Sequence, residues 1–172
     1  YLPAEDRRGR PGLKTILRSI SQAWTTRRSE VLRSSQSLTQ AIQVNAEAGS
    51  SATLTTDVLE RATQRFAQQY DATHGGFGPA PKFPRSHSLS FLLRAWSRTH
   101  NPKTLEMVEA TLDAMARGGI HDHLGGGFHR YSTDQHWLVP HFEKMLYDQA
   151  LLARAYLEAY QVTGNAKYAE VA

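Results

Sequence analysis

The sequence predicts an all-α fold built from helical hairpins. Apolar residues recur with the period of a helix along most of the chain, glycine or proline separates these segments, and no run alternates as a half-buried strand does. With 172 residues, 40% of them hydrophobic, the chain can bury one ordinary core. It has no cysteine, which excludes disulfides and thiolate chemistry within these residues.

The first expected helix follows the breaker Pro11-Gly12 and carries an apolar stripe from Leu13 to Trp24. A second helix is expected over 29–46, before a Gly-Ser-Ser linker at 49–51. Residues 1–40 hold eight Lys and Arg against three acids, a net charge of +5. These charges lie on the polar side of an amphipathic helix without interleaved aromatics, so we expect a solvated face and no nucleic-acid partner.

The third helix is expected to begin at Thr56-Asp57, where Glu60 has the spacing of a capping box, and to end at the glycines 75–76. Residues 77–84 contain three prolines and must be an extended connector. Lys82 and Phe83 lie in this connector, where they either face a ligand or merely sit in a stiff segment.

Four further helices are expected. One covers 86–99, and the next begins at Asn101-Pro102, a capping residue followed by a favoured first position. Pro140 is expected to open a long helix reaching about Thr163, which is apolar on almost every side and should be buried all round. A last helix is expected from about Ala166.

One short string recurs. Gly75-Gly76-Phe77 returns 51 residues later as Gly126-Gly127-Phe128, and each copy follows a helix and opens a connector. A period near 50 is typical of an array of helix pairs.

Residues 118–148 combine glycines, histidines, acids, basic residues and aromatics between two helical patterns. Such a mixture is typical of a pocket, which needs close backbone approach, groups that titrate near neutral pH and flat apolar surfaces. The segment therefore predicts a site without specifying a reaction.

Three strings resemble the thioredoxin-domain-containing family of spermatogenesis-associated protein 20: GGFGPAPKFP at 75–84, GGGFHRYS at 125–132 and VPHFEKMLYDQA at 139–150. The start of the chain, to Trp24, is similar to the end of that family's thioredoxin-like domain. The resemblance implies that residues 1–48 are the end of this domain plus a linker helix. Residues 53–172 would be the N-terminal hairpins of an incomplete α/α toroid of the six-hairpin glycosidase type. Such a fragment is expected to self-associate through exposed helix faces.

The resemblance also implies a site for a sugar or sugar phosphate at the mouth of the toroid, with epimerase-like or hydrolase-like chemistry. Aromatic rings would stack on the sugar, and carboxylates and imidazoles would exchange protons. The helix expected from Pro140 would place His141 and Glu143 at its positive end. The candidate catalytic residues are Asp122, His129, His141, Glu143 and Asp148, and the candidate ligand-binding residues are Lys82, Phe128, Arg130, Tyr131 and Trp137.

Other interpretations stay open. The charged residues could form a structural ion-pair network, with Lys144 and Asp148 at the i,i+4 spacing of a salt bridge. The toroid could be a non-catalytic scaffold or redox-linked adaptor that binds a protein or peptide. The histidines offer donors for zinc, but no spacing matches a metal motif, so we predict no metal and no cofactor. No signal peptide or membrane span is visible, and we expect a cytoplasmic protein without a membrane partner.

Overall fold

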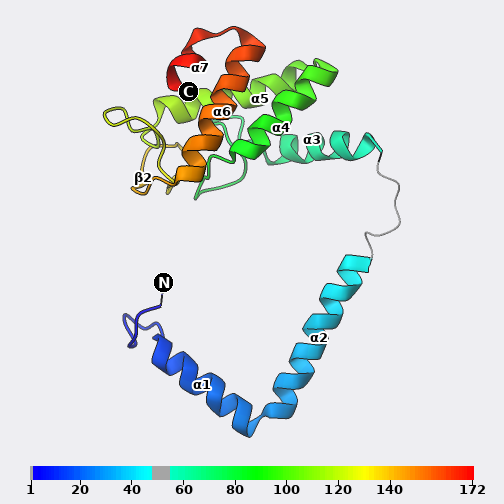
Figure 1. Cartoon of the computed structure of the whole chain (residues 1–172), viewed down its shortest axis with the longest axis vertical. Coiled ribbons are helices and arrows are strands. Elements are labelled where there is room, and N and C mark those ends of the chain that lie inside the picture. The colour runs from blue at the N-terminus through cyan, green and yellow to red at the C-terminus, as the bar shows by residue number, and fades with distance from the viewer. Residues whose placement is uncertain (1, 48–54) are drawn as a thin grey trace. The chain divides into compact units, whose positions relative to one another are not determined.

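The computed structural model describes residues 2–47 and 55–172, which divide into two compact units, Tyr1–Leu54 and Thr55–Ala172 (Figure 1). The described residues form seven helices and one pair of two-residue strands. The predicted all-α fold is therefore confirmed. The assignment of 1–48 to the end of a thioredoxin-like domain plus a linker helix, and of 53–172 to the N-terminal hairpins of an incomplete toroid, stays a prediction.

The first unit contains α1 (Leu13–Thr26) and α2 (Arg28–Glu47). They are separated at Arg27, whose backbone N–H donates to the carbonyl of Ala23 over 2.9 Å. The predicted stripe of α1 is present, but among its residues none is buried. Its apolar face therefore contributes no core to this unit.

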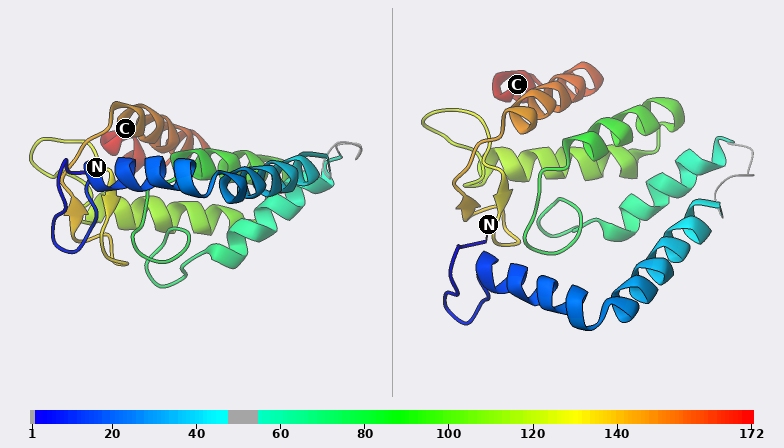
Figure 2. Two further views of the ribbon diagram at one scale, coloured as in Figure 1. Left: turned by 90° about the horizontal axis from the view of Figure 1, so that it is seen from below. Right: turned by 60° about the horizontal axis from the view of Figure 1, so that its bottom comes forward.

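The second unit holds the remaining helices. In Figure 2, α4 lies beside α5 and α6, with which it makes its main contacts; α3 packs against α4 and α5, and α7 packs against α6. Connections of two residues join α4 to α5 and α6 to α7, as in helical hairpins, whereas the longer segments 70–85 and 118–145 precede α4 and α6. The helices are α3 (Asp57–Gln69), α4 (Ser86–Thr99), α5 (Pro102–Arg117), α6 (Leu146–Thr163) and α7 (Ala166–Val171).

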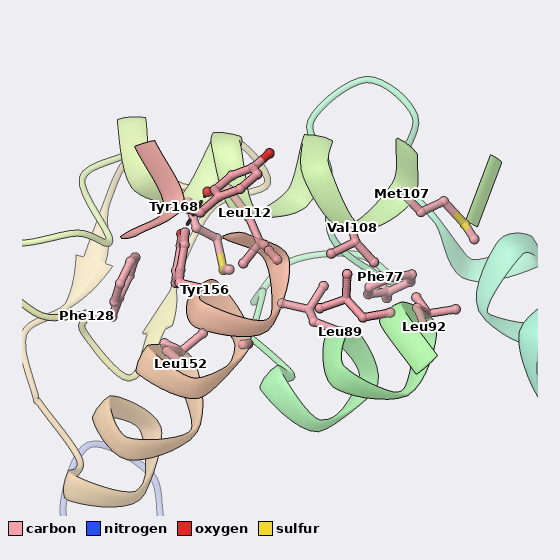
Figure 3. Close-up of a cluster of buried hydrophobic side chains, with 14 of the residues drawn as sticks. Phe77, Leu89, Leu92, Met107, Val108, Leu112, Phe128, Leu152, Tyr156 and Tyr168 are labelled. Carbon is pink, nitrogen blue, oxygen red and sulfur yellow. Dashed lines mark hydrogen bonds between the residues drawn. The ribbon is translucent and has the colours of Figure 1, made fainter. Parts of the chain in front are cut away.

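The core of this unit forms where α4, α5 and α6 meet (Figure 3). Leu89 of α4 and Leu112 of α5 are fully buried, and Tyr156 of α6 joins them while its hydroxyl donates to the carbonyl of Leu112 over 2.8 Å. Burying each such side chain stabilises the fold by roughly 1.5–3 kcal/mol. The same core holds Phe128, stacked on Tyr156 at 5.4 Å, so it anchors the candidate site segment to the helices.

The start of α5 agrees with the sequence, whereas α3 differs from the prediction in its cap and in its end. Asn101 caps α5 by accepting from the N–H of Lys103 over 3.1 Å, as predicted. In α3, however, the side chain of Thr56 makes no capping hydrogen bond within the described residues. The helix also ends at Gln69 rather than at Gly75-Gly76, because Asp71 turns the chain before the glycines are reached.

The predicted helix start at Pro140 is wrong. Residues Pro140–His141 form strand β2, which pairs antiparallel with β1 (Tyr131–Ser132), and α6 begins only at Leu146. The carbonyls of Val139 and Glu143 accept from the N–H groups of Thr133 and Arg130, respectively. Because these carbonyls bond across the hairpin, residues 139–143 do not form the first turn of a helix. His141 and Glu143 therefore do not lie at a helix N-terminus.

The predicted complete burial of the last long helix is also wrong. Leu152, Ala155 and Tyr156 are buried, but Leu151 and Leu157 on other sides of α6 are exposed. Within the second unit α6 packs mainly on α4 and α7, which leaves part of its circumference open. Among the described residues no helix is long and apolar enough to cross a bilayer.

Candidate functional site

The short hairpin presents a group of rings, which we name the aromatic face: Phe83, Tyr131 and His141. Tyr131 and His141 are register partners in the hairpin and stack at 4.8 Å with an interplanar angle of 20°. Phe83 comes from the proline-rich connector and lies 4.8 Å from Tyr131. Two backbone hydrogen bonds of 2.8 Å between Lys82 and Ser132 hold the connector beside β1.

An ion pair adjoins the aromatic face. A guanidinium N–H of Arg130 donates to Oε2 of Glu143 over 3.0 Å, and Nδ1 of His141 lies 3.6 Å from the same oxygen. This hydrogen bond raises the pKa of Arg130 above its ordinary value. Both side chains of the ion pair are 40% exposed, so they stay accessible to a polar ligand. The pair Arg130–Glu143 belongs to the ion-pair network that the sequence allowed.

Asp148, near the start of α6, differs from the other carboxylates. Burial raises the pKa of Asp148 above its ordinary value, and the nearby charge of Arg130 offsets this only in part. A carboxyl group that keeps its proton at higher pH is what a general acid requires. Asp148 therefore remains the candidate acid of the site.

Several polar atoms around the hairpin are buried without a hydrogen-bond partner in the described part of the chain. Such atoms cost roughly 1–3 kcal/mol each and concentrate at functional or strained sites. They are Nδ1 of His129, Nε of Arg130 and Oγ of Ser132.

The repeated Gly-Gly-Phe string belongs to a larger repeated structure. In the first copy, the first glycine loop (residues 71–77), the Asp71 carbonyl accepts from the N–H of Gly75 over 2.8 Å. Oδ1 of Asp71 accepts from the N–H groups of Thr73 and His74. Lys82 then closes the loop, because its Nζ donates to Oδ2 of Asp71 over 2.6 Å and to the carbonyl of Gly75 over 2.7 Å.

The second glycine loop (residues 122–128) has the same contacts. The Asp122 carbonyl accepts from the N–H of Gly126 over 2.9 Å, and Oδ1 accepts from the N–H groups of Leu124 and Gly125. Nζ of Lys144 donates to Oδ2 of Asp122 over 2.6 Å and to the carbonyl of Gly126 over 2.7 Å. The internal repeat is therefore confirmed, and each copy consists of an aspartate, two glycines and a lysine.

The two loops differ in what covers them. Lys82 is 1% exposed, and the indole of Trp137 lies over the first loop and donates to the carbonyl of His74 over 3.0 Å. The amide of Gln135 donates to Oδ2 of Asp71 over 2.8 Å. In the second loop the side chain of Lys144 is 35% exposed.

These contacts place the predicted site residues in two groups. Lys82, Phe128 and Trp137 are buried, and their contacts inside the chain favour a structural role, although ligand binding by them stays a prediction. The carboxylate of Asp122 is occupied by the second glycine loop in the same way. Of the other candidates, His141 is exposed, and Arg130, Tyr131, Glu143, Asp148 and His129 are half-buried around the hairpin.

Two residues that take part in these loops were missed in the sequence analysis, and a third was paired with the wrong partner. Asp71 and Gln135 were not singled out, although Asp at four residues before the first glycine of both copies was a visible signal. Lys144 pairs with Asp122 and not with Asp148, the partner that the i,i+4 spacing suggested. In residues 2–47 and 55–172 no group of three or more His, Cys, Asp or Glu could hold a metal ion.

Stability at acid pH tests the first glycine loop. Burial alone would raise the pKa of Asp71, but hydrogen bonds from Lys82, Gln135 and two backbone N–H groups hold it well below 3.8. A depressed folded-state pKa adds stability that is present above the unfolded value and is lost as pH falls below about 4. We expect urea unfolding between about pH 5 and pH 2 to show this loss, and Asp71→Asn to flatten it. If the free energy of unfolding of the variant depended on pH as steeply as that of the unchanged protein, the loss could not be attributed to Asp71.

No protein-family model matches the chain. Spermatogenesis-associated protein 20 of Homo sapiens is 43% identical over the whole chain, and its Mus musculus counterpart is 41% identical. An uncharacterized protein of Caenorhabditis elegans is 37% identical over 95% of the chain. The chain spans 23% of the length of each of these relatives.

Proposed function

The chain belongs to the family of spermatogenesis-associated protein 20, and we propose that its aromatic face binds a sugar or sugar phosphate. The observation that carries the proposal is the contact of Tyr131 with Phe83 and His141 beside the accessible pair Arg130–Glu143. Small-molecule sites combine such aromatic surfaces with a few polar groups that fix orientation.

Each part of the face has a role in this proposal. The rings supply flat apolar surface for the C–H face of a sugar, which suits their amphipathic chemistry. Arg130 offers N–H donors and Glu143 offers acceptor oxygens, so together they can bond hydroxyl groups, which both donate and accept. The guanidinium would also take the phosphate of a sugar phosphate.

We further propose that residues at this face transfer protons to and from the bound sugar. Asp148, with its raised pKa, would act as the acid, and His141 or Glu143 would act as the base. This division suits epimerase-like or hydrolase-like chemistry, which needs one protonated and one unprotonated group.

Thermal-shift screening of the full-length protein against sugars and sugar phosphates tests the proposal. A ligand at 100 times its Kd should stabilise the protein by about 2.7 kcal/mol. Tyr131→Ala should weaken that ligand at least about tenfold, because it removes the central ring of the face.

Tyr160→Ala is the matched control, since Tyr160 is an exposed tyrosine on α6 that belongs to neither the aromatic face nor the ion pair. The shift should survive this change. A panel without any stabiliser, or a stabiliser that is indifferent to Tyr131→Ala, would exclude the sugar site.

A protein- or peptide-binding scaffold is the second candidate. The large apolar side chains next to the hairpin favour it, because Leu138, Phe142 and Leu146 are 64%, 81% and 85% exposed. Exposed apolar groups of this kind mark interaction surfaces and also support the expected self-association. Silence across the sugar panel together with a peptide ligand would favour this function. As a redox-linked adaptor, the chain would depend on thiols elsewhere, since it has no cysteine.

A further inference from the structure

The two glycine loops are equivalent residue by residue at an offset of 51. Tyr70 bridges Phe77 as His121 bridges Phe128, and the N–H of Gly78 reaches the carbonyl of Gln69 as that of His129 reaches Ile120. The first loop follows α3 and leads to α4, and the second follows α5 and leads to α6. Because the two loops are equivalent, the packing around the first loop shows what can pack against the second loop.

The first loop is covered by polypeptide on two sides. On one side the indole of Trp137 lies against Gly76, and Nζ of Lys82 lies 5.4 Å from the ring, where the cation and the ring attract each other. On the other side α5 packs so closely that a Cβ on Gly75 would lie 2.9 Å from the carbonyl oxygen of Ala110.

The second loop offers the same groups with less cover. A Cβ on Gly127, the counterpart of Gly76, would lie 2.5 Å from Oε1 of Gln149, but no aromatic ring of the described residues beyond its chain neighbours lies within 4 Å of it. A Cβ on Gly126, the counterpart of Gly75, would meet nothing within 4 Å in the described part of the chain. Lys144, the counterpart of Lys82, keeps 35% of its side chain exposed. Leu124 at the tip is fully exposed, with a relative exposure of 101%.

We propose that the second glycine loop is an interface for a further polypeptide segment of the same longer protein, one that brings an aromatic ring over Lys144 and a helix onto Gly126. The acceptors match those of the first loop: the carbonyl of Gly125 corresponds to that of His74, and Oδ2 of Asp122 corresponds to that of Asp71. Relatives whose length this chain spans by only 23% have chain to supply the segment. The inference is independent of the proposed sugar site.

Amine acetylation followed by mass spectrometry tests the interface in residues 1–172 and in the full-length protein. Lys82 serves as the buried reference and Lys103, exposed at the start of α5, as the open one. In residues 1–172 we expect Lys144 to react faster than Lys82. In the full-length protein we expect the rate at Lys144 to fall about tenfold, because reaction then requires the cover to open.

A matched pair of variants separates cover from backbone strain. Gly126 and Gly164 have φ of +72° and +71°, and neither has an atom within 4 Å of an added Cβ among the described residues. Alanine therefore strains both backbones equally. Gly126→Ala should restore fast acetylation of Lys144 in the full-length protein, and Gly164→Ala should not.

Three results would overturn the interface. One is an equal rate at Lys144 in both lengths of the protein. Another is protection that arises in residues 1–172 as their concentration rises, which would assign the cover to a second copy. The third is protection of Lys144 in residues 1–172 by a sugar, which would assign the loop to the sugar site instead.

Discussion

Replacing Lys82 with Met lowers the free energy of unfolding by about 3–5 kcal/mol, because it leaves a buried carboxylate without its cation. The side chain of Lys82 is 0% exposed and that of its partner Asp71 only 11%. Water therefore cannot replace the lost ammonium group. Urea unfolding should show a lower midpoint with an unchanged slope, since the variant changes stability and not the surface exposed on unfolding.

The second glycine loop provides the control for this prediction. Lys144→Met breaks the same contacts to Asp122, but at a site where the two side chains are 35% and 27% exposed. Exposed ion pairs contribute only about 0–1 kcal/mol, so the loss should be small. Removing both charges of the buried pair, as Asp71→Asn with Lys82→Met, should recover part of the loss. Equal losses in the free energy of unfolding for Lys82→Met and Lys144→Met would contradict the claim that burial makes the first ion pair more important for stability.

Replacing Trp137 with Ala should cost about 3–5 kcal/mol, the range for removing a large buried aromatic side chain. The ring is 0% exposed and lies against Gly76, and its N–H donates to the carbonyl of His74. Trp137→Phe keeps most of the apolar contact but leaves that carbonyl without its donor, so we expect a smaller loss of about 1–3 kcal/mol. Thermal or urea unfolding measures both.

Trp24→Ala is the control, because Trp24 lies in the other unit and is 45% exposed. Its effect on unfolding should stay within about 0.5 kcal/mol, as for most surface substitutions. The effect of Trp137→Ala on stability also distinguishes a structural role of Trp137 from a ligand-binding role. A ligand-stacking tryptophan would leave stability unchanged and weaken sugar binding, whereas the structure predicts a large loss of stability.

Local signals sufficed for most of the helices. The range 86–99 agrees with α4 at both ends, and Asn101-Pro102 begins α5, because apolar spacing and capping are properties of neighbouring residues. The start of α6 was misjudged for the opposite reason. Pro140 is a good first residue of a helix, but here it pairs with Ser132, and a strand partner cannot be read from residues around the proline.

The candidate site was predicted as a segment and only partly as residues. Its mixture of histidines, acids, basic residues and aromatics distinguished 118–148, and several of its candidates keep some exposed surface around the hairpin. The residue types alone could not separate Tyr131, which stays partly accessible, from Trp137, which is buried over the first loop. Burial depends on what packs on a side chain, and that partner is distant in sequence.

The sequence by itself determined most of the helices, the repeated Gly-Gly-Phe string and the position of the site segment, because all three depend on local spacing. Only the tertiary structure decided the ion-pair partners and which copy of the loop is covered. Lys82 and Lys144 reach equivalent aspartates across 11 and 22 residues, so no single spacing reveals the pairs. Charge attraction and burial depend on distance in space, and the fold of the intervening chain sets that distance.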